Sequence, residues 1–270
     1  MNITFANSAK ADILAFLVDE DGALPKPAAD LDAAVGGLLS EALDGARFKG
    51  KKDQQAFIVL PKGSAARRAV LIGAGKPDKR DARTLEGLGA NLYKSHANSG
   101  FKSLAIHAGS PEDAARIAVG AKLASYRFDT YFTKKEDDQK PSLDSVTLVV
   151  ADVPAAETAF APLSAGADGT FLARDLVNMP PNDLYPASFA EKCRELGQYG
   201  VQVEVLGEEQ LAKLGMNSML GVGQGSVKES QLGIMKWMGG AEGEDPVILI
   251  GKGVCFDTGG ISLKPGPGME

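Results

Sequence analysis

Three ionisable side chains, Lys252, Asp257 and Lys264, lie close together in the sequence among small residues and glycines. They follow the apolar run from Val247 to Ile250, which predicts a short buried strand that ends at Gly251. Ligands of open α/β sheets bind at the carboxyl ends of strands. The spacing therefore predicts a polar ligand site at a strand end. Spacing alone also allows a simpler interpretation, two surface lysines and an aspartate in a turn.

A long motif surrounds these residues. Residues 251–265 read GKGVCFDTGGISLKP, and three further segments accompany it: YRFDTYFTKK at 126–135, RDLVNMPPNDLYP at 174–186 and MLGVGQGS at 219–226. Together they resemble the signature of the leucyl aminopeptidase family, the M17 peptidases, which are two-metal exopeptidases. The resemblance is clear from about residue 70 onward and extends to the earlier part only in its general α/β pattern. One departure is Cys255, which stands where many members have threonine.

The resemblance implies a role for each of the three residues. Lys252 and Asp257 match metal ligands of the family, and Lys264 matches an electrophilic catalyst. Only a neutral lysine amine has a lone pair, and burial beside divalent cations disfavours the charged form, so a buried lysine can become a ligand. An aspartate supplies hard oxygen to the same ions. A protonated Lys264 would polarise the scissile carbonyl or stabilise the oxyanion that forms.

The implied reaction is hydrolysis of the N-terminal peptide bond of a peptide at a pair of zinc, manganese or magnesium ions. Family members also use an arginine of a second signature, Asn-Thr-Asp-Ala-Glu-Gly-Arg, to seat a bicarbonate that acts as general base. That signature is not found in these 270 residues, so its arginine and the remaining carboxylate ligands are missing. We therefore expect this chain alone to bind metal weakly and not to turn over.

The composition limits the classes of partner. The net charge is −6 and the chain has no basic tract, so a nucleic-acid backbone is not expected as a partner. No apolar run approaches the roughly 20 residues of a membrane span. The N-terminus lacks a basic start followed by an apolar core, so it does not predict a secretory signal. A cytoplasmic protein is expected on this basis.

Histidine and cysteine usage narrows the kind of site. The two histidines, His96 and His107, lie far upstream of the candidate site, which excludes a histidine-rich zinc site in the C-terminal stretch. The two cysteines, Cys193 and Cys255, are too few for a disulfide framework and fit a reducing compartment. We interpret them as two small buried hydrophobic residues.

Alternating apolar runs and amphipathic stretches predict an α/β fold with a mostly parallel sheet covered on both faces. Strands are predicted at 11–18, 56–60, 69–72, 103–107, 145–150, 201–205, 233–238 and 247–250. Helices are predicted at 30–43, 81–96, 112–131, 156–177, 208–214 and from Pro186 to about Gly197, and residues 133–142 are predicted to form an exposed loop.

Two domains are expected. Residues 1–165 form a mixed-sheet domain with flanking helices, which by resemblance is macrodomain-like, and residues 166–270 form the first, incomplete part of the catalytic domain. Family members are hexamers, which implies a homo-oligomer. The alternative function is a non-catalytic module that binds ADP-ribose or another nucleotide, or serves as a scaffold, because macrodomain folds bind ADP-ribose. Within the YRFD segment, an ion pair between Arg127 and Asp129 at the end of a helix is the default expectation.

Overall fold

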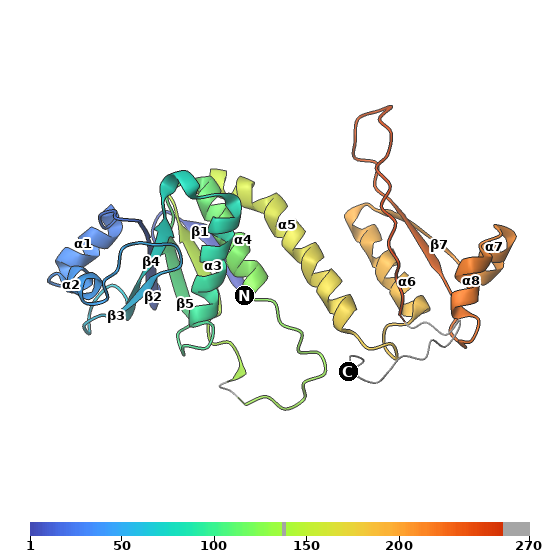
Figure 1. Ribbon diagram of the computed structural model, residues 1–270, viewed down its shortest axis with the longest axis horizontal. Coiled ribbons are helices and arrows are strands. Elements are labelled where there is room, and N and C mark those ends of the chain that lie inside the picture. The colour runs from blue at the N-terminus through green and yellow to red at the C-terminus, as the bar shows by residue number, and fades with distance from the viewer. Residues whose placement is uncertain (137–138, 256–270) are drawn as a thin grey trace. The chain divides into compact units, whose positions relative to one another are not determined.

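The N-terminal part of the chain is built around a six-stranded sheet (Figure 1). The structure is a computed structural model that describes residues 1–136 and 139–255. The spatial order of the strands is β1-β6-β5-β2-β4-β3, and only β3 runs antiparallel to its neighbour. The strands are β1 (Asn2–Ala6), β2 (Ile13–Asp19), β3 (Gln55–Val59), β4 (Arg68–Gly75), β5 (Ser103–His107) and β6 (Ser145–Val149). The predicted mostly parallel sheet is confirmed, whereas β1 was not predicted.

Helices cover both faces of this sheet. One apolar core joins the sheet to α1 and α2, and a second joins the opposite face to α3, α4 and the start of α5 (Figure 1). The central strands are therefore buried on both sides, which explains their continuous apolar sequence. The helices are α1 (Lys26–Ala34), α2 (Leu38–Gly45), α3 (Ala82–His96), α4 (Pro111–Ala124) and α5 (Val153–Asn178).

The predicted helix at 30–43 is wrong in one respect, because the structure has two helices there. Gly36 and Gly37 both have positive φ values, 73° and 85°, a backbone conformation that side chains with a Cβ rarely adopt. The chain turns at this pair and starts α2 in a new direction. The buried carboxylate of Asp32 then accepts hydrogen bonds from Leu39 N, at 2.7 Å, and from the N–H and hydroxyl of Ser40.

Helix α4 is also shorter than predicted. It starts at Pro111 with Ser110 as N-cap, whose hydroxyl accepts from Asp113 N at 3.1 Å, and it ends at Ala124 rather than near residue 131. The YRFD segment therefore lies in the loop after the helix, outside regular structure. The predicted strand at 145–150 and the predicted helix at 156–177 both follow this loop and are confirmed.

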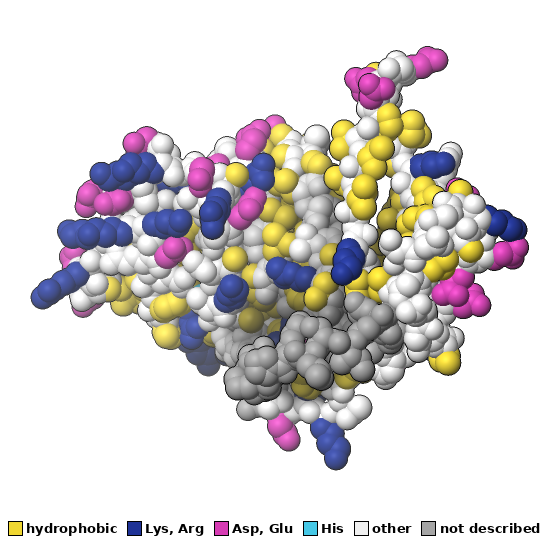
Figure 2. Space-filling model, turned by 45° about the vertical axis from the view of Figure 1, so that its right-hand side comes forward, with side chains coloured by type: hydrophobic (Ala, Val, Ile, Leu, Met, Phe, Trp, Pro, Cys, Tyr) yellow, Lys and Arg dark blue, Asp and Glu magenta, His cyan; other side chains and the backbone are white. Residues whose placement is uncertain are grey.

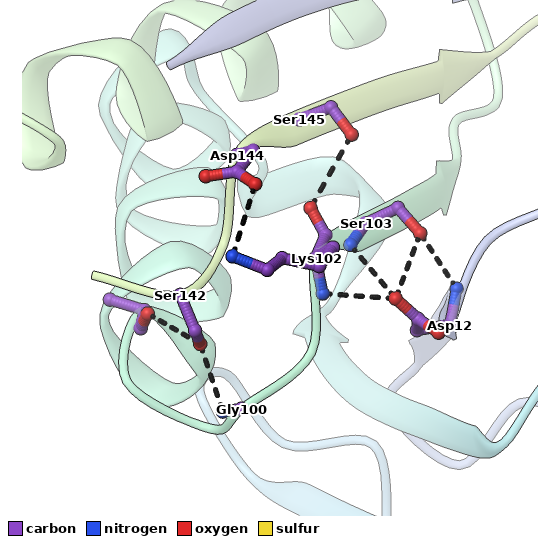
Figure 3. A network of polar contacts seen from close by, with 8 residues as sticks. Asp12, Gly100, Lys102, Ser103, Ser142, Asp144 and Ser145 are labelled. Atoms are coloured by element: carbon purple, nitrogen blue, oxygen red, sulfur yellow. Dashed lines mark hydrogen bonds and ion pairs between the residues drawn. The ribbon is translucent and has the colours of Figure 1, made fainter. Parts of the chain in front are cut away.

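A polar network ties together the starts of three parallel strands (Figure 3). The Asp12 carboxylate, just before β2, accepts from Lys102 N at 2.9 Å and from Ser103 N and Oγ at 3.2 Å, at the start of β5. The Lys102 ammonium lies 3.4 Å from the Asp144 carboxylate beside the start of β6. The hydrogen bond from Lys102 N is the main cause that holds the pKa of Asp12 below its usual range. The network fixes the relative register of these strands.

Helices α3 and α4 cross closely because a glycine lies at each side of the contact. A Cβ on Gly89 would come within 1.9 Å of the Ile117 carbonyl oxygen, and a Cβ on Gly120 within 1.9 Å of the Glu86 carbonyl oxygen. An ion pair of 2.8 Å between Arg116 of α4 and Glu86 of α3 also links the two helices at this crossing. Backbone packs against backbone here, so no larger residue fits without moving a helix.

The chain divides into two compact units, Met1–Asp175 and the residues from Leu176 onward. The predicted domain boundary near residue 165 falls inside α5 and remains a prediction. The second unit contains a two-stranded antiparallel sheet of β7 and β8, and its elements match most of the predicted ones. They are α6 (Pro186–Glu195), β7 (Gln202–Leu206), α7 (Glu208–Lys213), α8 (Asn217–Gly223) and β8 (Leu232–Lys236). None of the described helices is both long and apolar enough to cross a bilayer.

Candidate active-site segment

The stretch that leads to the candidate site follows β8. Val247, Ile248, Leu249 and Ile250 are 88, 76, 90 and 95% exposed, and no strand is assigned to them. The predicted buried strand at this position is therefore wrong for the described structure. A strand needs neighbours for its backbone hydrogen bonds and for its apolar side chains, and the described part of the second unit places none beside this run.

Other hydrophobic side chains accompany this run at the surface. Trp237 and Met238, which directly follow β8, are also largely exposed. Figure 2 shows hydrophobic side chains along the projecting segment, below a tip that carries acidic side chains. The acidic residues of the sequence between β8 and Val247 are Glu242, Glu244 and Asp245, around a turn in which Glu244 N donates to Ala241 O. The segment thus exposes a continuous apolar patch next to an acidic turn. A contiguous patch differs from the single exposed hydrophobic residues that are normal on protein surfaces.

The end of the segment returns to helix α6. A Cβ on Gly253 would lie 2.7 Å from Cε1 of Phe189, so the backbone of residue 253 passes directly against that ring. A side chain at this position would require the Phe189 ring to shift. Helix α6 itself starts at Pro186 as predicted, and the Ser188 hydroxyl caps it by accepting from Tyr185 N at 2.9 Å.

The structure describes one of the three predicted site residues. Lys252 is exposed, next to the glycine that contacts α6. Asp257 and Lys264 lie outside the described residues, so the convergence of the three side chains remains a prediction. Among residues 1–136 and 139–255, no three His, Cys, Asp or Glu side chains form a group that could hold a metal ion. Of the two predicted metal ligands, Lys252 lies within the described residues and Asp257 does not.

The two cysteines are free thiols and both are half-buried. Burial raises the pKa of Cys193 and of Cys255 above that of an ordinary thiol. A thiol with a raised pKa stays protonated at neutral pH and is a poor nucleophile. The Cys193 sulfur lies 3.5 Å from the position that a Cβ on Gly233 would take, so it packs between α6 and β8. These contacts fit a packing role for Cys193.

Both histidines belong to the first unit. His96 is fully buried on α3, and its Nδ1 lies 2.9 Å from the Leu92 carbonyl oxygen, while its Nε2 has no hydrogen-bond partner among the described residues. His107 stacks on Phe16 with ring centroids 4.7 Å apart. Burial lowers the pKa of both imidazoles, which are therefore neutral at pH 7.

The YRFD segment forms an ion cluster. Asp129 accepts from Arg127 Nε at 3.2 Å and also pairs with Lys135, whose hydrogen bond is the main cause that lowers the pKa of Asp129. The Lys135 ammonium also lies 4.7 Å from the centre of the Phe132 ring. The expected ion pair between Arg127 and Asp129 is confirmed, but its expected place at a helix end is wrong, because α4 ends at Ala124 and the pair lies in the following loop. Lys135 is an additional partner that was not predicted.

Comparison with known proteins places these observations in a family. The model of the cytosol aminopeptidase family N-terminal domain matches residues 15–135, and the model of the catalytic domain of the same family matches residues 171–270. The chain belongs to the cytosol aminopeptidase family. This membership confirms the resemblance on which the site prediction depends.

Curated relatives agree along nearly the whole chain. A probable cytosol aminopeptidase of Caulobacter vibrioides is 46% identical over 259 residues, which cover 95% of this chain and 52% of that protein. One of Agrobacterium fabrum is 43% identical over 278 residues, which cover 100% of this chain and 56% of that protein. The chain therefore spans about half the length of the curated relatives it matches. The alternative of an ADP-ribose-binding or scaffold module is not favoured by these relatives.

Solved structures share the fold. A mutant tomato leucine aminopeptidase superposes with a TM-score of 0.73 at 25% identity and covers 85% of this chain and 49% of that one. The bottromycin maturation enzyme BotP in complex with Mn superposes with a TM-score of 0.63 at 24% identity, covering 82% of this chain and 44% of that one. Both likenesses show the α/β fold, and the match to part of a catalytic domain comes from the family model over residues 171–270.

Proposed function

We propose that the whole protein to which these residues belong is a cytoplasmic metallo-aminopeptidase that removes N-terminal residues from peptides. The observation that carries this proposal is the motif at 251–265 in a chain that matches both domains of the family. The name of the relatives, cytosol aminopeptidase, supports the cytoplasmic location. We further propose a homo-oligomer, a hexamer as in the family, and no nucleic-acid or membrane partner.

In this proposal Lys252 and Asp257 hold a shared pair of divalent ions, zinc, manganese or magnesium, and Lys264 faces the same cavity. An amine nitrogen and a carboxylate oxygen form a donor set that suits such ions. When bound, the ions would polarise the scissile carbonyl and activate a water. Lys264 would donate a hydrogen bond to the carbonyl oxygen as negative charge develops there. Two protein ligands do not complete the coordination of two ions, so further ligands, and the bicarbonate seat, belong to the rest of the protein.

The decisive experiment compares three proteins in the hydrolysis of leucine p-nitroanilide with added Mn²⁺: the whole protein, its Lys264→Ala variant and the 270-residue chain. We expect turnover by the whole protein, and a loss of about 100-fold or more in the variant, as for removal of one oxyanion donor. We expect no turnover by the 270-residue chain.

Metal content gives an independent control. The Lys264→Ala variant of the whole protein should retain its metal, and Asp257→Asn should lose part of it, as measured by mass spectrometry of the bound ions. Full activity of the Lys264→Ala variant would contradict the assigned role. Measurable hydrolysis by the 270-residue chain would contradict the expectation that it lacks part of the site.

A further inference from the structure

Strand β1 is an edge strand whose outer side is free in the described part of the chain. It pairs only with β6, in parallel, with Thr4 opposite Thr147. The hydrogen bonds from Asn2 N to Asp144 O and from Val150 N to Ala6 O fix the phase of this ladder. In a parallel ladder, alternate residues direct both backbone groups to the same neighbour. The N–H and C=O groups of Ile3 and Phe5 therefore point away from the sheet, toward the free edge.

A groove lies beside this free edge. It has a volume of about 540 Å³ and lies between Ile3, Thr4 and Phe5 of β1 and one face of α5. The half-buried rings of Phe5 and Phe160 form part of its lining, with centroids 5.3 Å apart. Exposed Ala161 and Ala165, four residues apart on α5, leave the space open because their side chains are small. The groove lies entirely within the first compact unit.

The rim of the groove is acidic. Glu157 is exposed and forms no ion pair with any described residue. Asp168, at the other end of the groove, forms an ion pair with Lys122, whose ammonium lies 2.7 Å from the Asp168 carboxylate. The unneutralised charge is therefore the one on Glu157. Two copies of this edge paired with each other would supply no free cation for Glu157, because the Lys122 ammonium already pairs with Asp168 and Ser164. Charge complementarity therefore favours a basic partner over a second copy of the chain.

We propose that this edge and groove bind an extended peptide segment of a partner protein, which adds a strand to the sheet next to β1. The segment carries an apolar side chain and a basic side chain on the same face. Its backbone bonds to the outward groups of Ile3 and Phe5, its apolar side chain enters the groove beside Phe160, and its basic side chain pairs with Glu157. This is strand addition, in which the main chain supplies affinity and alternate side chains supply specificity.

The spacing of the groove fits this arrangement. Glu157 and Ala161 are one helical turn apart, about 6 Å along the helix axis. Side chains on one face of a strand repeat every second residue, at about 6.6 Å. In the proposed complex the added strand runs along α5, so that an apolar residue opposite Ala161 places a basic residue two positions away within reach of Glu157. The flexible side chain of a lysine or arginine accommodates the small difference between the spacing along the helix and the spacing along the strand.

The test uses the 270-residue chain and a fluorescein-labelled peptide, acetyl-Lys-Thr-Leu-Thr-Lys, with acetyl-Glu-Thr-Leu-Thr-Glu as its charge-reversed control. The acetyl group removes the free N-terminus that an aminopeptidase requires, so the result is independent of the proposed function. We expect saturable binding of the lysine peptide by fluorescence anisotropy and binding at least tenfold weaker for the glutamate peptide. In hydrogen exchange, the amides of Ile3 and Phe5 should slow on binding, while that of Thr4 should not change.

A matched pair of variants locates the site. Ala165→Arg places a cation in the groove and should weaken the lysine peptide at least tenfold, whereas Ala173→Arg, an exposed position of the same helix outside the groove, should not. Equal binding of the two peptides, or no effect of Ala165→Arg, would overturn the proposal. So would protection of Ile3 and Phe5 without peptide in a chain that sediments as a dimer, because the occupant would then be a second copy.

Discussion

Two apolar runs with almost the same composition differ in burial in this protein. Val70, Leu71 and Ile72 of β4 are completely buried, whereas the residues from Val247 to Ile250 are exposed. Both runs precede a glycine and both predict a buried strand. β4 lies between β2 and β3 and contributes to both cores of the first unit. The comparison shows that an apolar run specifies a strand only where other strands and helices supply the hydrogen bonds and the cover.

The same substitution, leucine to lysine, should have very different effects in the two runs. Leu71→Lys places an unpaired charge in a dry core and should cost about 5 kcal/mol or more, enough to unfold the first unit. Leu249→Lys, at an exposed position, should change the free energy of unfolding by less than about 0.5 kcal/mol. It should also reduce self-association of the 270-residue chain, because it interrupts an exposed apolar patch.

Urea unfolding followed by circular dichroism measures the first effect, and sedimentation velocity measures the second. A loss of stability in Leu249→Lys close to that in Leu71→Lys would mean that the run from Val247 to Ile250 is buried in solution, and the contrast between the runs would disappear.

Helical glycines of the two units differ in the space around them. Gly120→Ala should destabilise the protein by about 3 kcal/mol, because its Cβ would meet the Glu86 carbonyl oxygen and force α3 and α4 apart. In the second unit, Gly221 of α8 has open space around its Cβ position, so Gly221→Ala should be neutral or stabilising by up to about 1 kcal/mol. Midpoints of thermal unfolding distinguish these outcomes.

Gly87→Ala is the matched control within the first unit, since Gly87 lies on α3 with nothing near its Cβ position. It should stabilise rather than destabilise. Equal losses at positions 87 and 120 would show that helix propensity or general sensitivity, and not the close crossing, determines the effect.

Asp32 tests a polar contact of the first unit. Burial by itself would raise the pKa of Asp32, but the hydrogen bonds from Ser40 and Leu39 outweigh it and hold the pKa below its usual range. Asp32→Ala leaves the first turn of α2 without its acceptor and should cost about 2 kcal/mol. Asp30→Ala, on the same helix, removes only an exposed pair with Lys26 and should cost less than about 0.5 kcal/mol. Urea titrations at pH 7 compare the two, and similar losses would contradict the capping role.

The smallest expected effect concerns pH. The pKa of His96 in the folded protein is lowered by burial, so below the unfolded value of about 6.5 the unfolded chain binds a proton that the folded chain does not. Stability should therefore fall as the pH drops through 6.5 toward 5. His96→Leu should reduce this slope, measured by urea unfolding at pH 7.5, 6.5 and 5.5.

His107→Leu is the companion variant, because burial also lowers the pKa of His107. Each single variant should retain the contribution of the other histidine, and the double variant should lose both. A slope that neither variant changes would assign the pH dependence to carboxylates instead, such as Asp12 and Asp32, whose lowered pKa values reduce stability at lower pH.

Much of the first unit could be predicted from its residues. The apolar runs at 69–72 and 103–107 and the periodic helix beginning after Asp81 predicted their elements well, because each has a strong local pattern and a clear start or stop signal. β1 was missed because Asn2 and Thr4 interrupt its short apolar pattern, and its strand character comes from pairing with β6. The break between α1 and α2 was missed because helical periodicity continues across Gly36 and Gly37.

The amino-acid sequence was sufficient to predict the α/β class, most elements of both units and, through the motif at 251–265, the family and the residue types of the candidate site. These follow from local chemistry: backbone preferences, apolar periodicity and side-chain donors are properties of neighbouring residues. The strand order, the burial of one apolar run and the exposure of another became visible in the folded structure, as did the close crossing at Gly89 and Gly120 and the groove beside β1. Those depend on which segments meet in space, and a one-dimensional pattern does not encode that meeting directly.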